Sequence, residues 1–355
     1  MRWSAIRREL AREVLSGTTR ALSMLLVAGC LLAVLLGAEL AVTRGVLQDA
    51  ERFRAAGGST IVMNLPGGVD AARCERLAAV PGVRAAGALR ADAQRPLTAS
   101  ALPGAPLPRF HTTPGLPALL GARGADGGGV VLSRDAARAL GVAAGDTVAS
   151  AEGPVRIAAE YDYPDDGRRP GLGYAVLVPA PAQGAFDECW LDAWPPLEDA
   201  RSLLLFTANG RSEVPPEFSQ LNSTLGLEFD GAAEFAGRAS LAAAPLAFLA
   251  FALVGGASVR IRRLQLAAAR HYGVRPAEQT AMLLLGAGVW IAPPACLGVS
   301  AGLLASALTP VEGRELLLVV ACRVVLAACG GALAGVVLQA ALIRERHLFR
   351  YFKDR

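Results

Sequence analysis

Four long apolar runs constrain this chain more than any other feature of its sequence. A helix that crosses a membrane needs about 20 predominantly apolar residues. Four stretches meet that requirement and predict spans within residues 21–43, 231–258, 281–308 and 316–343, the second range including a short stalk before its span. The first run is too long for the core of a signal peptide, so a retained anchor is favoured over a cleaved signal.

Arginine residues beside the apolar runs indicate the orientation of the spans. Short loops rich in Arg or Lys stay on the cytoplasmic side, and residues 1–20, 259–280 and 344–355 are all basic. Both termini and the middle loop are therefore predicted to be cytoplasmic, which an even number of crossings allows. Residues 58–230 and the short outer loop at 309–315 then lie outside.

Helical patterns flank the first span on both sides. Residues 1–20 combine apolar residues at helical spacing with several arginines. They form either a helix in the membrane interface or simply the cytoplasmic start of the span. Residues 44–57 remain helical in character and are expected to carry the helix out of the bilayer as a stalk, which a pair of glycines ends. Pro293 and Pro294 lie within the third run and predict a kink in that span.

The outside segment, residues 58–230, alternates predicted strands and helices and is interpreted as an α+β domain. A strand at 59–65 is followed by a helix for which Asp70 is the expected cap, and then by a strand at 83–89. Residues 129–148 predict a strand, a Ser-capped helix, a glycine turn and a second strand.

The middle of this segment, about residues 95–183, is rich in Gly and Pro. We expect it to be inserted into a subdomain that both ends of the segment form. Near the far end, strands are predicted at 202–208 and 225–229, with a helix at 216–221 between them.

The loop between the second and third spans has the composition of a short helix. Val259 to Tyr272 contains neither Gly nor Pro, and its Leu, Ala, Arg and Gln residues are good helix formers. Gly273 and then Pro276 follow in the order that ends a helix. One interpretation is an ordinary basic loop that only fixes the topology.

In register, this loop resembles the cytoplasmic loop of the MacB/FtsX-type ABC transporter permeases. The matching positions are Arg262, Leu266, Ala267, Arg270, Tyr272, Gly273 and Val274. Leu264, Gln265 and His271 depart from the family pattern. One span, a large outside domain and then three spans is also the layout of that family, so the resemblance covers essentially the whole chain.

The resemblance implies both a fold and a function. The fold would be a four-span α-helical membrane domain, with a two-part MacB-like α+β domain between spans 1 and 2, in a bacterial plasma membrane. The chain would be the permease subunit that couples ATP hydrolysis on a separate ATPase subunit to movement of the outside domain, for export, extraction or mechanotransmission. The short helix would dock on that ATPase through Arg262, Arg263, Gln265, Leu266, Arg270, His271, Tyr272 and Gly273.

Partners and cofactors follow from the same resemblance. Besides the ATPase, a second permease is expected, in a homodimer or a heterodimer, together with an envelope protein or lipoprotein. ATP and Mg would be bound by the ATPase, and no cofactor is expected in this chain. The arginines beside the spans are explained by topology and by anionic lipid headgroups, so nucleic acid is not an expected partner.

Two cysteines lie outside the predicted spans, Cys74 and Cys189. An exported domain meets an oxidising environment, so a disulfide between them is favoured over two free thiols.

Two ionisable residues, Glu39 and Arg323, fall inside predicted spans at similar depth. Charges within a membrane are costly and usually paired. These two residues form an ion pair, within one subunit or across a dimer, or each reaches the outer interface separately. Gly-x-x-x-Gly patterns at 298–302 and 331–335 would allow close packing of helices.

No motif in the sequence predicts catalysis. The three histidines are scattered, and the sequence contains no zinc-ligand spacing, nucleophile elbow or phosphate-binding loop. The chain is therefore not expected to be an enzyme, and any ATPase must be another polypeptide. The alternative function is a membrane scaffold or signalling protein whose outside domain binds an envelope protein. A membrane hydrolase is the least favoured class.

Overall fold

The computed structural model describes residues 20–124 and 128–343. The chain forms two compact units, Met1–Asp49 with Asp230–Arg355, and Ala50–Phe229. The expected interfacial helix at 1–20, apart from its last residue, and the C-terminal tail lie outside the described residues.

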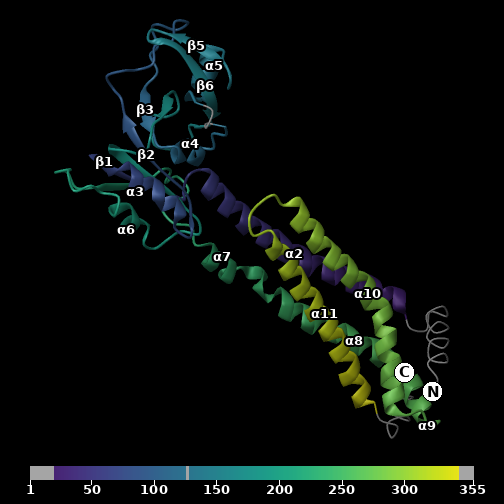
Figure 1. Cartoon of the computed structure of the whole chain (residues 1–355). Helices are drawn as coiled ribbons and strands as arrows, with labels where there is room; N and C mark the ends of the chain where they lie inside the picture. The colour runs from purple at the N-terminus through teal and green to yellow at the C-terminus, as the bar shows by residue number, and fades with distance from the viewer. Residues whose placement is uncertain (1–19, 125–127, 344–355) are drawn as a thin grey trace. The chain divides into compact units, whose positions relative to one another are not determined.

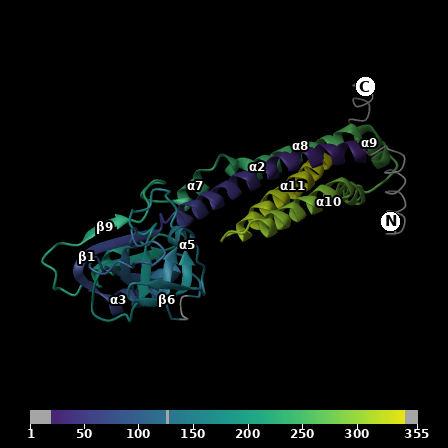
Figure 2. The ribbon, with the colours of Figure 1, turned by 90° about the horizontal axis from the view of Figure 1, so that it is seen from above.

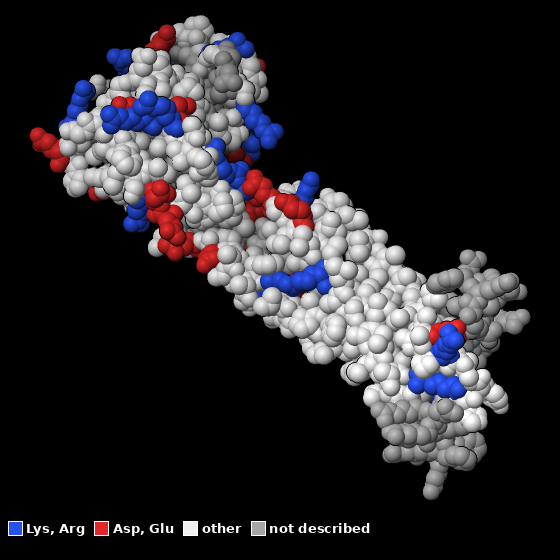
Figure 3. Space-filling model, turned by 60° about the horizontal axis from the view of Figure 1, so that its bottom comes forward, with Lys and Arg blue, Asp and Glu red and all other residues white. Residues whose placement is uncertain are grey.

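The first unit is a helical membrane domain. Among the described residues, four of its helices are long and apolar enough to cross a membrane, and they run along one another in both ribbon views (Figures 1 and 2). The face of this unit visible in Figure 3 carries few charged side chains along the helices. The helices of this unit are α2 (Ala21–Ala55), α7 (Gly231–Gly237), η3 (Ala239–Ala242), α8 (Ala243–Ile261), α9 (Arg263–His271), α10 (Pro276–Leu308) and α11 (Glu315–Leu342).

The spans pack through stripes of small and apolar residues. On α8 the buried residues Ala243, Ala247, Phe251, Gly255 and Val259 recur every four positions, which places them on one helix face. This face meets α11 at close range, because a Cβ added at Gly331 or Gly335 would lie 2.0 Å from a backbone oxygen of α8. The Gly-x-x-x-Gly pattern at 331–335 therefore packs α11 against α8 within one chain.

The membrane helices differ from expectation in two places. The predicted stalk before the second span is not continuous, because α7 ends at Gly237 and Arg238 has an extended backbone, with φ −62° and ψ 135°. The third span begins at Pro276, earlier than predicted, and remains one helix through Pro293 and Pro294. Proline at the first position of a helix costs no hydrogen bond, which explains the earlier start.

The second unit is an α+β domain built on one nine-stranded mixed sheet (Figure 1). The strand order is β5-β6-β4-β7-β3-β2-β8-β1-β9, and only the pairs β3–β7 and β4–β6 are parallel. The strands are β1 (Thr60–Asp70), β2 (Val83–Ala91), β3 (Arg109–Thr112), β4 (Val130–Ser133), β5 (Thr147–Ser150), β6 (Gly153–Tyr161), β7 (Val176–Pro179), β8 (Ala185–Ala193) and β9 (Glu217–Gln220). The helices are α3 (Ala71–Arg76), η1 (Leu77–Ala79), α4 (Gly115–Leu119), α5 (Arg134–Leu140) and α6 (Ala200–Leu205).

The strand order reflects an inserted middle segment. Strands β3 to β7 all come from the middle of the domain and occupy one half of the sheet, whereas β1, β2, β8 and β9 come from its two ends and occupy the other half. The two parts are joined by the pairing of β2 with β3. The two-part architecture is therefore present as one continuous sheet.

Local sequence signals were reliable where a capping residue set the boundary. Asp70 accepts a hydrogen bond from the backbone N–H of Arg73, and Ser133 accepts one from Ala136, as predicted for both helix starts. Gly141 ends α5 in the left-handed region, with φ +68°. Such a φ strains any residue with a Cβ, so glycine is favoured there.

The predictions for residues 202–229 were wrong. Residues 200–205 form helix α6, in which Ala200 and Leu204 are buried four positions apart. A short apolar run does not distinguish a strand from a buried helix turn. The predicted helix at 216–221 is instead strand β9, which pairs with β1. No strand forms at 225–229, where Phe229 packs its ring against Phe53 and Trp194.

Candidate functional site

Helix α9 is the part of the membrane unit with the features of a docking element. It lies between α8 and α10 and is separated from α8 only by Arg262, which ends one helix and begins the next. Leu266 and Ala267 are buried against the spans, whereas Gln265, His271 and Tyr272 are exposed. Tyr272 is 87% exposed. The helix is therefore amphipathic, with one face packed on the spans and the other exposed.

Arg270 points into the bundle and is not part of the exposed face. Its Nε donates to Gln279 Oε1 at 2.7 Å, and its Nη2 donates to the carbonyl of Ala340 at 3.0 Å. Nη1 donates to the carbonyl of Ile343. These two carbonyls lie at the C-terminus of α11, where helix geometry leaves backbone acceptors without partners and a cation is favoured. Arg270 thus ties α9 to α10 and α11.

Gln279 completes this anchor. It is a buried polar residue on α10, and its Nε2 donates to the carbonyl of Leu266 on α9 at 2.8 Å. Gly273 follows α9 with φ +86°, a conformation that ends a helix and favours glycine. Of the eight residues expected to dock, Leu266 and Arg270 therefore hold α9 in place, while Gln265, His271, Tyr272 and Gly273 are exposed. Arg262 and Arg263 are half-buried.

A charge cluster in the membrane unit ties together α2, α11 and the residue between α7 and η3. Glu39 on α2 is fully buried, and its Oε1 accepts from Arg323 Nη2 of α11 at 2.8 Å. The same oxygen accepts from Arg238 Nη2 at 3.0 Å and Nε at 3.3 Å. Arg238 also donates to the carbonyl of Phe235 and stacks on its ring. Two guanidinium groups thus share one carboxylate.

Arg238 was missed by sequence reasoning because it lies just before the second apolar run and was assigned to a stalk helix. The sequence offered one signal for it. A single Arg stands just before the second apolar run, and the first apolar run contains a Glu. The residue at which the helix breaks is thus also the one that contacts Glu39.

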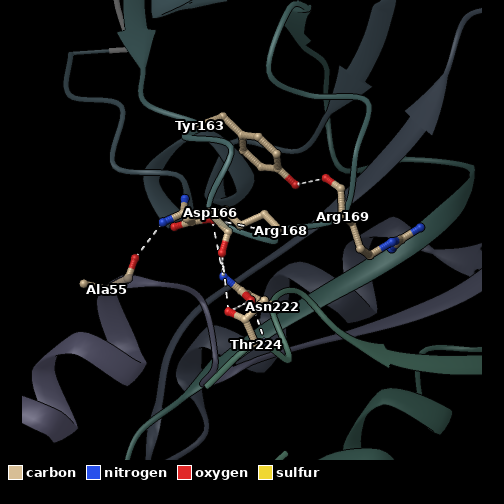
Figure 4. Close-up of polar contacts among 7 residues, drawn as sticks. All are labelled: Ala55, Tyr163, Asp166, Arg168, Arg169, Asn222 and Thr224. Atoms are coloured by element: carbon tan, nitrogen blue, oxygen red, sulfur yellow. Dashed lines mark hydrogen bonds and ion pairs between the residues drawn. The ribbon is translucent and has the colours of Figure 1, made fainter. Parts of the chain in front are cut away.

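Within the α+β domain, the end of α2 is held by side chains from distant segments. Arg168 Nη2 donates to the carbonyl of Ala55, the last residue of α2, at 2.6 Å (Figure 4). Phe53 is buried, with its ring 5.7 Å from that of Phe229 and 6.5 Å from that of Trp194. An Arg at a helix C-terminus satisfies a free carbonyl and complements the helix dipole. The domain therefore caps the helix end and buries its last aromatic residue.

The loop that carries Arg168 is itself fixed by polar contacts. Arg168 pairs with Asp166 at 3.3 Å, and Asn222 Nδ2 donates to the backbone oxygen of Asp166 at 3.1 Å (Figure 4). Tyr163 donates to the carbonyl of Arg169 at 2.6 Å, and burial raises the pKa of Tyr163 to about 12. The phenol therefore stays a neutral donor at physiological pH. These contacts join the loop after β6 to the segment after β9.

The disulfide between Cys74 and Cys189 is present, as predicted. It joins α3 to β8, and both residues are buried in one apolar core with Met63, Phe186 and Leu191. It closes a loop of 115 residues, so it fixes the helix to a strand that arrives much later in the chain.

A shallow hollow of about 410 Å³ lies beside the end of α2 in the same domain. Its charged lining is paired, since Arg54 contacts Glu51 and Arg84 lies 3.9 Å from Asp192.

In the described part of the chain no three His, Cys, Asp or Glu side chains gather as a metal site. His111 contacts Asp92 at 3.2 Å, and among the described residues no hydroxyl or thiol hydrogen-bonds this imidazole. These residues offer no nucleophile and base arrangement.

Comparisons with known proteins give similarities of fold. No family model matches the sequence, and no curated protein matches it significantly. One similar solved structure is the periplasmic region of MacB from Actinobacillus actinomycetemcomitans, with a TM-score of 0.35 and 12% identity, covering 49% of this chain and 94% of that one. Another is a domain of a protein named as a permease from Porphyromonas gingivalis, with a TM-score of 0.34 and 13% identity, covering 47% and 92%.

Proposed function

We propose that this chain is the permease subunit of an ABC transporter of the MacB/FtsX type, and that α9 docks on a separate ATPase subunit. The observation that carries the proposal is the construction of α9. It is a short helix between two spans, anchored by Leu266 and Arg270 and exposing Gln265, His271 and Tyr272. A loop that only set the orientation of the spans in the membrane would need its positive charge. It would not need an amphipathic helix anchored to those spans.

The anchor gives a route by which α9 moves the spans. A push on α9 is transmitted to α10 through the Gln279–Leu266 and Arg270–Gln279 hydrogen bonds. It is transmitted to α11 through the carbonyls that Arg270 caps. Coupling across a protein is carried by packed elements and hydrogen-bond networks of this kind. The closing of two ATPase subunits would thereby change the packing of the spans.

Helix α2 supports the proposed transmission toward the α+β domain. It is continuous from Ala21 to Ala55, and the boundary between the two compact units falls within it, after Asp49. At about 1.5 Å per residue, its 35 residues exceed the roughly 30 Å hydrocarbon core. Arg168 and the ring of Phe229 hold its end. We infer that the domain moves with α2, outside the membrane, while both chain termini stay in the cytoplasm.

The experiment that tests this function is purification of the tagged full chain from its native membrane in mild detergent, followed by identification of the proteins that accompany it. A stoichiometric protein with a phosphate-binding loop is expected with the wild type and is expected to be lost with Tyr272→Ala. Phe206→Ala is the matched control, because Phe206 is 74% exposed and aromatic but lies in the α+β domain. It should retain the ATPase.

Two outcomes would contradict the proposal. If only envelope proteins accompany the wild type, the scaffold interpretation is favoured. If an ATPase accompanies the wild type and is retained by Tyr272→Ala, α9 is not the docking element. Circular dichroism and gel filtration of both variants show whether each remains folded, so that a loss of partner is not confused with a loss of structure.

A further inference from the structure

The cluster of Glu39, Arg238 and Arg323 has more positive than negative charge. Both guanidinium groups contact the same carboxylate oxygen of Glu39, so one positive charge is not neutralised within the cluster. The second oxygen of Glu39 is buried and has no hydrogen-bond partner among the described residues. That oxygen lacks a hydrogen-bond donor, which an anion does not supply. The excess positive charge is a separate feature, and an additional anion would balance it.

Arg323 is the member of the cluster that an outside ligand can reach. The side chain of Arg238 is 2% exposed and that of Glu39 is fully buried, whereas that of Arg323 is 40% exposed. Arg323 donates to Glu39 through Nη2 alone. Its Nε is buried and has no hydrogen-bond partner in the described part of the chain, so an outside ligand must bind through the terminal nitrogens. A guanidinium group has five N–H donors in a planar fork that matches phosphate oxygens.

The position of Arg323 along α11 places it near the headgroup region. The helix has 28 residues, which is about 42 Å at 1.5 Å per residue, whereas the hydrocarbon core is about 30 Å thick. Arg323 follows Glu315, the first residue of the helix, by eight positions, or about 12 Å. In a centred helix its Cα then lies only about 6 Å inside the hydrocarbon boundary, within reach of a long side chain directed toward the interface.

The neighbouring surface of α11 is suited to acyl chains. Val319 and Leu326 lie four positions before and three positions after Arg323, on the same helix face. They are 61% and 70% exposed. An exposed guanidinium between exposed apolar residues fits a molecule that carries a phosphate at one end and hydrocarbon at the other. Free phosphate would use only the first of these features.

We propose that Arg323 binds the phosphate of an anionic phospholipid from the leaflet at this end of the spans, so that the phosphate and Glu39 share its guanidinium. The phosphate of the lipid would neutralise the excess charge, and its acyl chains would cover the exposed face of α11 around Arg323. Binding a lipid here would stabilise the contact among α2, α11 and the segment before α8, which all three residues join. This site is distinct from α9 and does not depend on the identity of the ATPase.

The test is native mass spectrometry of the full chain in a neutral detergent, titrated with phosphatidylglycerol. The wild type is expected to retain one lipid molecule. Arg323→Gln should bind it about tenfold more weakly, the loss expected for one charge-assisted hydrogen bond. Arg314→Gln is the matched control, because Arg314 precedes the same helix but lies outside the cluster, and it should bind like the wild type. Diacylglycerol with the same chains and inorganic phosphate should each bind poorly.

A third variant separates lipid binding from a purely structural role. Glu39→Gln removes the carboxylate that competes for Arg323, so phosphatidylglycerol should bind at least as tightly as to the wild type. If Arg323 did not contact the lipid and only held the helices together through Glu39, then Glu39→Gln and Arg323→Gln should both lose the lipid. Equal binding of phosphatidylglycerol to the wild type and to Arg323→Gln would overturn the proposal. The proposal would also be overturned if the wild type bound diacylglycerol or inorganic phosphate as tightly as phosphatidylglycerol. A dimer of this chain that only Arg323→Gln dissociates would overturn it as well.

Discussion

Arg270 matches the family pattern as a basic residue of a docking loop, yet in the structure it caps the end of α11. Its three guanidinium nitrogens donate to Gln279 and to the carbonyls of Ala340 and Ile343. The sequence does not show where the Arg270 side chain points, because the two carbonyl acceptors belong to a segment some 70 positions later. Gln265 and Tyr272, which the resemblance also named as docking residues, are exposed in the structure.

Replacement of Arg270 tests this role at the residue scale. Arg270→Gln should lower the stability of the membrane unit by about 1–3 kcal/mol, because Gln279 Oε1 and the Ile343 carbonyl lose their charged donor. Thermal unfolding of the purified chain in detergent measures the change. Arg275→Gln removes a charge from an exposed position of the same loop and should leave the unfolding temperature almost unchanged. Equal effects of the two variants would show that only the charge of the loop matters.

At the element scale, the sequence located the spans well and the short elements of the α+β domain less well. Apolar runs and capping residues such as Asp70 and Ser133 act locally, so they could be read directly. Helix α6 and strand β9 could not be, because the contacts that decide between helix and strand in so short a segment come from distant parts of the sheet. The same holds for the break at Arg238, whose partner Glu39 lies 199 positions earlier.

The contact between α8 and α11 gives a prediction with an adjacent control. A Cβ at Gly331 would lie 2.0 Å from the carbonyl oxygen of Phe248, so Gly331→Ala must push the two helices apart. At Gly330 the nearest atoms are side-chain carbons of Phe248 at 3.9 Å, which leaves room for a methyl group. Gly331→Ala should therefore lower the unfolding temperature in detergent, as overpacking costs about 1–3 kcal/mol. Gly330→Ala should have no such effect, and a similar loss in both would contradict the packing described.

At the scale of the whole molecule, one chain combines a four-span membrane domain with an α+β domain whose sheet receives an inserted middle segment. Hydropathy and arginine placement predict the spans and their sidedness because the bilayer acts on local composition. The strand order is not predictable in this way, since it depends on pairings between segments far apart in the chain. Helix α2 is continuous across the boundary between the two units, which is why we assign it the transmission of motion.

The central claim is that the exposed face of α9 contacts an ATPase, and site-specific photocrosslinking in native membranes tests it most directly. A photoreactive phenylalanine analogue replaces Tyr272 in one strain and Phe206 in another, both of them exposed aromatic positions. We expect the probe at 272 to crosslink to a protein with a phosphate-binding loop and the probe at 206 not to do so. If the probe at 272 captures only lipid or an envelope protein, or if both positions capture the same ATPase, the assignment of α9 as the docking helix is wrong.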